Sequence, residues 1–270
     1  FALGSTGSVY HTGDGGSQNT IYGYDAGIAL ASSVDNNVLI GYEAGKALNG
    51  GDQNVIVGHQ AGDALTSGED NIFVGQSAGG ATTAGTSMVI VGRNAGISNI
   101  TAAAVGSIGI GYGALAALTS GEGNVAIGYQ ALDACTDSDK NTAVGHLALS
   151  AVTGAAGDTN NTAVGWSAGA GITSGLYNTL VGKSVMVTDD EGNGTTAMGN
   201  NAVSLQNVGN ETSGTTAIGY GAGYSNVTGL NNTWVGFNAG TGGTGSNSGN
   251  TGIGKDALLS VTTGGNNVVV

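Results

Sequence analysis

The stretch Asn141-Thr142-Ala143-Val144-Gly145 returns unchanged at residues 161–165. Close variants of this five-residue phrase recur along the whole chain of 270 residues, mostly at intervals of 17 to 20 residues. The phrase ends in a glycine, which we call the register glycine. A short, fixed period indicates a stack of equivalent coils rather than a set of globular domains. The register glycines are Gly4, Gly23, Gly41, Gly58, Gly75, Gly92, Gly111, Gly128, Gly145, Gly165, Gly182, Gly199, Gly219, Gly236 and Gly254.

A period near 17 residues is too short for a helix-pair repeat, which needs about 33 residues or more. It suits one coil of a β-solenoid, in which a short strand pairs with its equivalent one coil away, at about 4.8 Å. The sequence therefore predicts an all-β fold, a β-solenoid (β-helix or β-roll) of about 15 coils. We expect a single continuous repeat array over residues 1–270, and a segment of a longer fibre.

When the repeats are aligned on the register glycine, the residues at each position form a column, and three such columns directly precede the glycine. The residue directly before it is apolar in every repeat and is often β-branched, as at Val57 and Val74, which is typical of a buried strand position. The residue three places before the register glycine is mostly Val or Ile in the first half of the chain and Thr from Thr142 onward. The residue between them, such as Ile56 or Phe73, is also apolar or glycine. Because side chains alternate along a strand, both strand faces are apolar, and we expect both to be covered.

One cover for such a strand is the interior of its own coil. The simplest candidate for the other is a second copy of the chain, so the pattern predicts a homo-oligomer. An alanine column three residues after the register glycine, for example Ala44 and Ala61, marks a close backbone approach. That approach lies either inside a narrow coil or at an axis between subunits.

An asparagine column stands four residues before the register glycine. Stacked asparagines at a corner of a solenoid can hydrogen-bond to their equivalents above and below and can tolerate left-handed backbone geometry. We therefore predict a structural ladder, not a catalytic set, at Asn19, Asn37, Asn54, Asn71, Asn124, Asn141, Asn161, Asn178, Asn232, Asn250 and Asn267. Met88, Ser107, Thr195 and Thr215 interrupt this column.

An aromatic column follows the register glycine directly. Its rings could stack on sugar rings, stack on each other, or cover the bare glycine backbone. Candidate glycan-contacting residues are Tyr24, Tyr42, Tyr112, Tyr129, Trp166, Tyr220 and Phe237, with His59 and His146 in the same column.

The formal net charge is −13 with only five basic residues, which excludes a simple electrostatic nucleic-acid binder. We expect the acidic residues of the turns to form a solvating surface, with cation binding between turns as the alternative. They include Asp35, Asp52, Glu69, Asp70, Glu122, Asp137, Asp139, Asp189, Asp190 and Glu191. The glycine-rich calcium-binding repeat is absent, so no metal site is predicted.

Candidate catalytic groups do not assemble. His11, His59, His146 and the single Cys135 fall in separate coils or at different positions of a coil, so we expect neither an enzyme nor a cofactor. The apolar columns are also too short for membrane spans, and no membrane insertion of this segment is expected.

The phrases at residues 141–145, 161–165 and 215–219, followed by alanine and a turn of the Thr-Ser-Gly type, resemble repeats of two families. These are bacteriophage tail fibres and trimeric autotransporter adhesins. The resemblance implies a homotrimeric β-helical rod, exposed outside a cell or on a virion tail. The expected function is an extracellular fibre stalk that presents an attachment tip. The alternatives are a subunit of an extracellular structural filament and a carbohydrate-binding β-solenoid.

Overall fold

The computed structural model describes residues 9–10, 18–101, 103–153, 157–242, 245 and 247–270. All regular secondary structure in these residues is β, and they contain no helix. The chain makes about 14 turns of a parallel β-solenoid, which confirms the predicted fold class. The first phrase of the repeat, residues 1–4, lies outside the described residues. The chain falls into two units, Phe1–Asp137 and Ser138–Val270, and each is described by itself.

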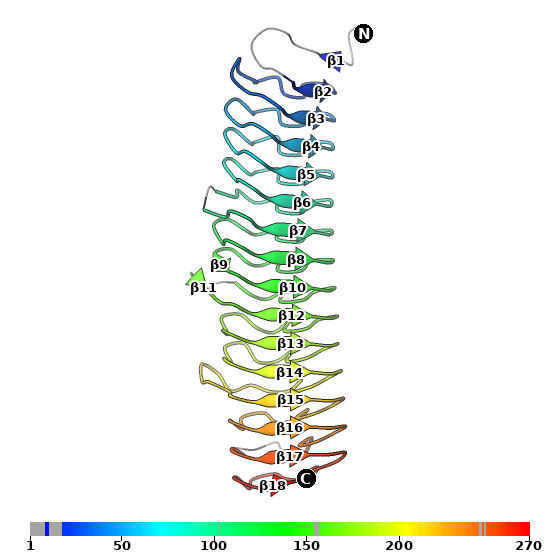
Figure 1. The fold of residues 1–270 in the computed structure, drawn as a ribbon, viewed down its shortest axis with the longest axis vertical. Coiled ribbons are helices and arrows are strands. Elements are labelled where there is room, and N and C mark those ends of the chain that lie inside the picture. The colour runs from blue at the N-terminus through cyan, green and yellow to red at the C-terminus, as the bar shows by residue number, and fades with distance from the viewer. Residues whose placement is uncertain (1–8, 11–17, 102, 154–156, 243–244, 246) are drawn as a thin grey trace. The chain divides into compact units, whose positions relative to one another are not determined.

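In the first unit, strands of three residues stack in chain order, each parallel to the next (Figure 1). Pairing joins equivalent residues of successive repeats, for example Val55 with Ile72 and Val57 with Val74. A two-residue strand, β1 (Val9–Tyr10), instead pairs antiparallel with β2. The stacked strands are β2 (Thr20–Tyr22), β3 (Val38–Ile40), β4 (Val55–Val57), β5 (Ile72–Val74), β6 (Val89–Val91), β7 (Ile108–Ile110) and β8 (Val125–Ile127).

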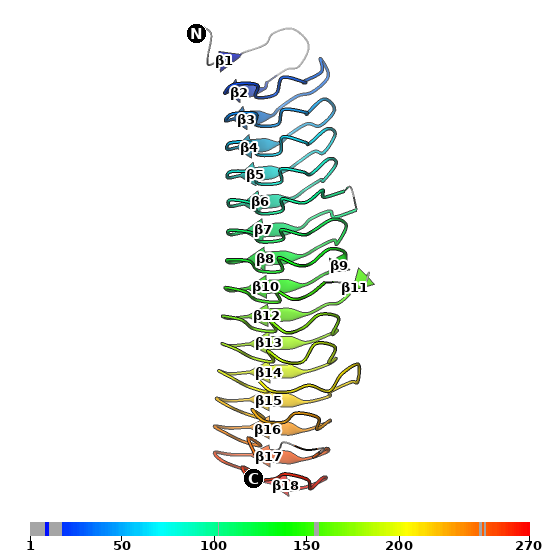
Figure 2. The same ribbon diagram turned by 180° about the vertical axis from the view of Figure 1, so that it is seen from behind.

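The second unit repeats this arrangement, as the view from behind also shows (Figure 2). Two further short strands, β9 (Ser138–Asp139) and β11 (Gly157–Asp158), form a separate parallel pair. The stacked strands are β10 (Thr142–Val144), β12 (Thr162–Val164), β13 (Thr179–Val181), β14 (Thr196–Met198), β15 (Thr216–Ile218), β16 (Thr233–Val235), β17 (Thr251–Ile253) and β18 (Val268–Val269).

The middle residue of the three-residue strands is the one that faces the core. Ile56, Phe73 and Trp234 are fully buried, whereas Val55 and Met198 on the flanking positions are 36% and 51% exposed. The prediction that the residue before the register glycine is buried is therefore wrong for the single chain. With only three residues in the strand, alternation places one side chain inside the coil and two outside.

The alanine column lies inside the coil. Ala44, Ala61 and Ala78 are fully buried by their own chain, which decides between the two alternatives left open by the sequence. Ala61 sits between two left-handed residues, Gln60 (φ 53°) and Gly62 (φ 50°). This tight turn brings the backbone close to the core, where only a methyl group is accommodated.

Left-handed backbone is also frequent outside glycine. In a typical coil it occurs just before the asparagine and two residues after the register glycine, as at Gln53 (φ 62°) and Gln60. Even the β-branched Val203 adopts it, with φ 42°. Such conformations are uncommon for residues with a side chain, and neighbouring coils stabilise them here through backbone hydrogen bonds. One example is the bond from the Gln60 N–H to the Tyr42 carbonyl, at 2.8 Å.

The register glycine has a different role from these turn residues. Gly58 has φ 143°, and a Cβ added there would overlap the carbonyl oxygen of Gly75 in the next coil. The same overlap with the next register glycine recurs down both units, for example at Gly145 and Gly219. The recurrence of glycine at this position therefore follows from both the backbone angle and the packing of one coil on the next.

We predict that Gly58→Ala destabilises the fold by about 3 kcal/mol or more, because the methyl group meets backbone that cannot move without shifting a coil. Gly50→Ala is the matched control. Gly50 is exposed, has no positive φ, and its added Cβ would have no neighbour closer than 3.8 Å. We expect it to change stability by less than about 1 kcal/mol. Denaturant unfolding measures both, and equal effects would contradict this explanation of the register glycine.

Candidate functional site

The aromatic column lies on the outer surface, directly after the strands. All seven candidate rings are exposed, from 43% at Tyr112 to 54% at Tyr24. Each ring follows a register glycine, so the coil repeat places it next to its equivalent in the adjacent coil. The column is thus accessible to solvent.

The rings stack on one another in short runs. In the first unit, Tyr24 stacks on Tyr42 (centroids 5.6 Å apart), Tyr42 on His59 (5.0 Å) and Tyr112 on Tyr129 (5.3 Å). In the second unit, His146 stacks on Trp166 (6.1 Å) and Tyr220 on Phe237 (5.3 Å). The planes differ by 8° to 18°, so the contacts are face to face.

Cationic side chains cover several of the remaining ring faces. The Arg93 guanidinium lies 5.9 Å from the Tyr112 centroid. Lys183 lies 5.2 Å from the Trp166 ring, and Lys255 lies 6.0 Å from the Phe237 ring. Three of the five basic residues of the chain are therefore placed for cation–π contacts, which are typically worth about 0.5–1 kcal/mol at exposed sites.

These contacts restrict how the column could bind a sugar. Carbohydrate rings stack on aromatic faces, and here many faces already contact another ring or a cation. What the column offers to solvent is mainly its ring edges and hydroxyl groups. Glycan contact at this column remains a prediction, and its strongest geometry, stacking on a free face, is available at few of the described rings.

The asparagine column forms a buried ladder of hydrogen bonds. The Oδ1 atom of Asn37 accepts from the backbone N–H of Asn54 (2.9 Å) and from its Nδ2 (3.0 Å). Nδ2 of Asn54 also donates to the carbonyls of Gly68 (2.9 Å) and Asp52 (3.1 Å). In the second unit, Asn161 and Asn178 repeat the bond between coils at 3.0 Å. The amides thus tie consecutive coils together, and all members except the exposed Asn267 are buried and offer nothing to a ligand.

The interruptions of the column keep part of this bonding. Asn71 accepts from the backbone N–H of Met88 (3.1 Å), and Asn178 accepts from that of Thr195 (2.9 Å). At Ser107 a hydroxyl replaces the amide and accepts from the N–H of Asn124 (3.2 Å). The backbone N–H groups of Met88 and Thr195 therefore still bond to the preceding asparagine, and the Ser107 hydroxyl still accepts from the next one. At Thr215 the ladder is replaced, because its N–H donates to the Ser213 hydroxyl instead (3.2 Å).

The groups considered for catalysis do not form a site in the described part of the chain. Cys135 is buried, His59 and His146 are exposed, and His11 lies outside the described residues. Among the residues described, His, Cys, Asp and Glu form no group of three or more that could hold a metal ion. Nor does that part contain a helix long and apolar enough to cross a membrane.

One of the acidic residues that were expected on the solvating surface lies in the core instead. Asp189 is fully buried, so its assignment to that surface is wrong. It lies seven residues after its register glycine, a position that faces the core. The sequence carries a signal for this burial, because the other members of the column include the buried residues Leu48, Leu65, Leu118, Cys135, Val152 and Ile172.

Hydrogen bonds partly compensate the burial of Asp189. Its carboxylate accepts from the Gly192 N–H (3.0 Å) and from Nε2 of Gln206 (3.2 Å), which also donates to Oγ1 of Thr195 (3.0 Å). Burial raises the pKa of the Asp189 carboxyl, and these hydrogen bonds offset the rise only in part. The Gln206 Oε1 and Thr215 Oγ1 atoms are buried and have no hydrogen-bond partner among the described residues.

Comparison of the chain with protein-family models and with curated protein sequences gives no match.

The ring stack yields a prediction about both stability and binding. In a double-mutant cycle of Tyr112→Ala and Tyr129→Ala, we expect a coupling of about 0.5–1.5 kcal/mol in the free energy of unfolding, because either substitution removes the stacking contact between the two rings. We also expect the double variant and the wild type to elute alike from a column of immobilised polysaccharide. Retention of the wild type that the double variant loses would instead favour the carbohydrate-binding alternative.

Asp189 yields a prediction about pH. Since its folded pKa is raised above the unfolded value, its stabilising contribution is complete below the unfolded pKa and is lost as pH rises through the folded pKa. Over that window, wild-type stability should fall relative to Asp189→Asn, by at most about 1.4 kcal/mol per pH unit. Thermal unfolding from pH 4 to pH 8 measures the difference. Glu191→Gln, at an exposed neighbour, is the control and should run parallel to the wild type.

Proposed function

We propose that this chain is a structural segment of an extracellular fibre, a stalk that holds an attachment tip away from a surface. Shafts of phage tail fibres and of bacterial surface adhesins are fibres of this kind. The observation that carries the proposal is the continuous bonding between coils. It includes the strands, the buried amides and the turns, where the Gly62 N–H donates to the Ala78 carbonyl at 2.9 Å.

Such bonding suits a mechanical role. Within each unit a coil contacts the coils before and after it. The stability of the stack is therefore approximately the sum of the stabilities of the coils and of the interaction energies between adjacent coils. Opening one coil breaks backbone bonds on both of its sides and exposes its buried amide. This arrangement resists local unfolding and proteolysis along the stack, and the polar turns and the net charge of −13 keep the surface solvated.

The outer face of the sheet supports self-association. In the first unit, the two outward columns of β3 to β8 consist of Val and Ile alone, and several of these side chains are more than a third exposed. In β10 to β17 of the second unit, threonine fills one of these two columns. Apolar patches of more than a few hundred Å² are rare on monomers and usually mark an interaction surface. A second copy of the chain would cover this face, and the resemblance to fibre repeats favours three copies.

The same observations fit the runner-up, a repeated subunit of an extracellular structural filament. A stalk would form a closed oligomer of fixed mass, whereas a filament would grow with concentration. The carbohydrate-binding alternative depends instead on the exposed edges of the aromatic column.

We predict a native mass near three times 25.9 kDa, independent of concentration, measured by light scattering on a gel-filtration column. Val55→Glu combined with Val89→Glu places two charges on the apolar face and should shift the mass toward that of one chain. Ser33→Glu combined with Ser67→Glu adds the same charge on exposed turns and should leave the oligomer intact. A monomeric wild type would contradict the proposal, and a mass that rises with concentration would favour the filament.

A further inference from the structure

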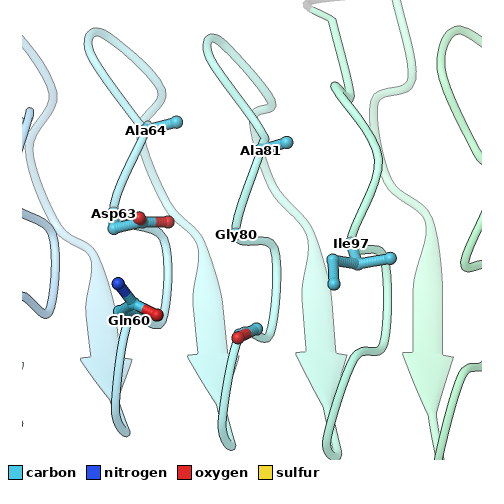
Figure 3. A pocket seen from close by; sticks show the side chains of 7 residues that line it. Gln60, Asp63, Ala64, Gly80, Ala81 and Ile97 are labelled. Atoms are coloured by element: carbon cyan, nitrogen blue, oxygen red, sulfur yellow. The ribbon is translucent and has the colours of Figure 1, made fainter.

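A hollow of about 350 Å³ opens on the turns that follow β4, β5 and β6 (Figure 3). Its origin lies in one column, the fifth residue after each register glycine. In three successive coils this column holds Asp63, Gly80 and Ile97. Because Gly80 has no side chain, space remains between the carboxylate on one side and the isoleucine on the other. The hollow lies on the turns and not on the apolar face of the sheet.

One wall of the hollow is rich in hydrogen-bond acceptors. The Asp63 carboxylate extends toward Gly80 (Figure 3), and a Cβ added to Gly80 would lie 3.5 Å from its Oδ1. Nε2 of Gln60 donates to Glu43 at 2.8 Å, which leaves the Oε1 of Gln60 as an acceptor. The Ser77 hydroxyl also lines this space. Partial burial raises the pKa of Asp63. The charge of Glu43 adds to the rise, and the charge of Lys46, at the equivalent position of the preceding coil, opposes it.

The opposite wall is apolar. Ile97 is 36% exposed and reaches back toward Gly80, and the methyl groups of Ala64 and Ala81 line the same space (Figure 3). The backbone donors nearby are already used, since the N–H groups of Ala64 and Ala81 donate to the carbonyls of Gly80 and Ile97, each at 3.2 Å. The hollow therefore presents acceptors and a carboxylate on one side and aliphatic surface on the other.

We propose that this hollow binds a primary ammonium group carried on a short aliphatic stem. An ammonium group has three donors and no acceptor, which matches the carboxylate, the amide oxygen and the hydroxyl of the polar wall. The methylene groups of the stem pack on Ile97 and Ala81. The net charge of −13 raises the local concentration of cations and repels anions. A neutral sugar fits less well, because its hydroxyl groups also require donors. This inference does not depend on the fibre proposal.

The probe for the test is n-pentylamine, with 1-pentanol as its uncharged counterpart. In spectra of protein labelled at the Ile and Ala methyl groups, we expect a saturable shift at Ile97, Ala64 and Ala81 with the amine and none with the alcohol. Binding should weaken in high salt, and also as pH falls through the pKa of Asp63, when the carboxylate is neutralised. An open hollow of this size predicts dissociation constants of roughly millimolar strength.

Three variants define the site. Asp63→Asn should weaken amine binding about tenfold or more, because it removes the charge-assisted hydrogen bond. Gly80→Ile copies the residue of the next coil and should abolish binding by filling the hollow. Gly80 has no positive φ, and other coils hold Asp63 and Ile97 at this position, so we expect the fold to tolerate the change. The Ser77 carbonyl oxygen, 3.3 Å from the added Cβ, must shift by a few tenths of an ångström. Asp133→Asn removes the same charge at the equivalent position of another coil and should leave binding unchanged.

Two further probes identify the source of the amine. Tighter binding of an Nα-acetyl-lysine amide than of diaminopentane would indicate a lysine side chain of a partner protein, and the reverse would indicate a free small amine. Equal shifts with pentanol, a shift with methyl glucoside but not with the amine, or full binding by Gly80→Ile would each overturn the proposal. The native mass is measured separately, so the fate of the fibre proposal remains distinguishable from this result.

Discussion

The close stacking of one coil on the next is the constraint on which the rest of the structure depends. At the register glycines from Gly23 to Gly111 and from Gly145 to Gly236, the backbone of one coil lies directly against the carbonyl of the following one, and a single added carbon atom would separate them. This approach fixes the pairing of strands residue for residue. Once the register is fixed, every other position of the repeat forms its own column. The buried amides, the alanines of the core and the exposed rings are therefore consequences of one repeated backbone contact.

The repeat made much of the fold predictable from the sequence. Its period indicated a β-solenoid, and the column of asparagines suggested the bonding between coils that the structure contains at Asn37 and Asn54. Which strand face is buried was not predictable in the first unit, because all three strand columns are apolar there, apart from Thr20. In the second unit the threonines from Thr142 onward lie on the outward face and were a signal for it. The face that is buried depends on the left-handed turns around residues such as Ala61. Many of the left-handed positions carry ordinary side chains such as Gln60, so the sequence does not reveal that the backbone is left-handed there. Asp189 was predicted at the surface because it is acidic and lies next to other acidic turn residues. Its position seven residues after the register glycine, in a column of mostly apolar residues, indicates the core instead.

The candidate sites depend on departures from the repeat rather than on the repeat itself. The aromatic column is interrupted at several positions, among them Gln76, Arg93, Lys183 and Lys255. The last three of these place a cation against a neighbouring ring. The hollow exists because Gly80 omits one side chain between Asp63 and Ile97. Sequence patterns reveal columns readily, but they do not reveal how much space a missing side chain leaves, or whether a ring face is already occupied.

Each coil bonds only to the coils next to it, and this has a consequence for how the number of repeats can change by mutation. A duplication or loss of one whole repeat joins two equivalent edges, so the new junction has the same hydrogen bonds as the old one. A single-residue insertion within the strand phrase would instead displace every column of that coil from its neighbours. Recombination between similar repeats in the gene can therefore lengthen or shorten the stack in steps of one coil. The number of repeats then sets the length of the stack independently of the chemistry of any one turn.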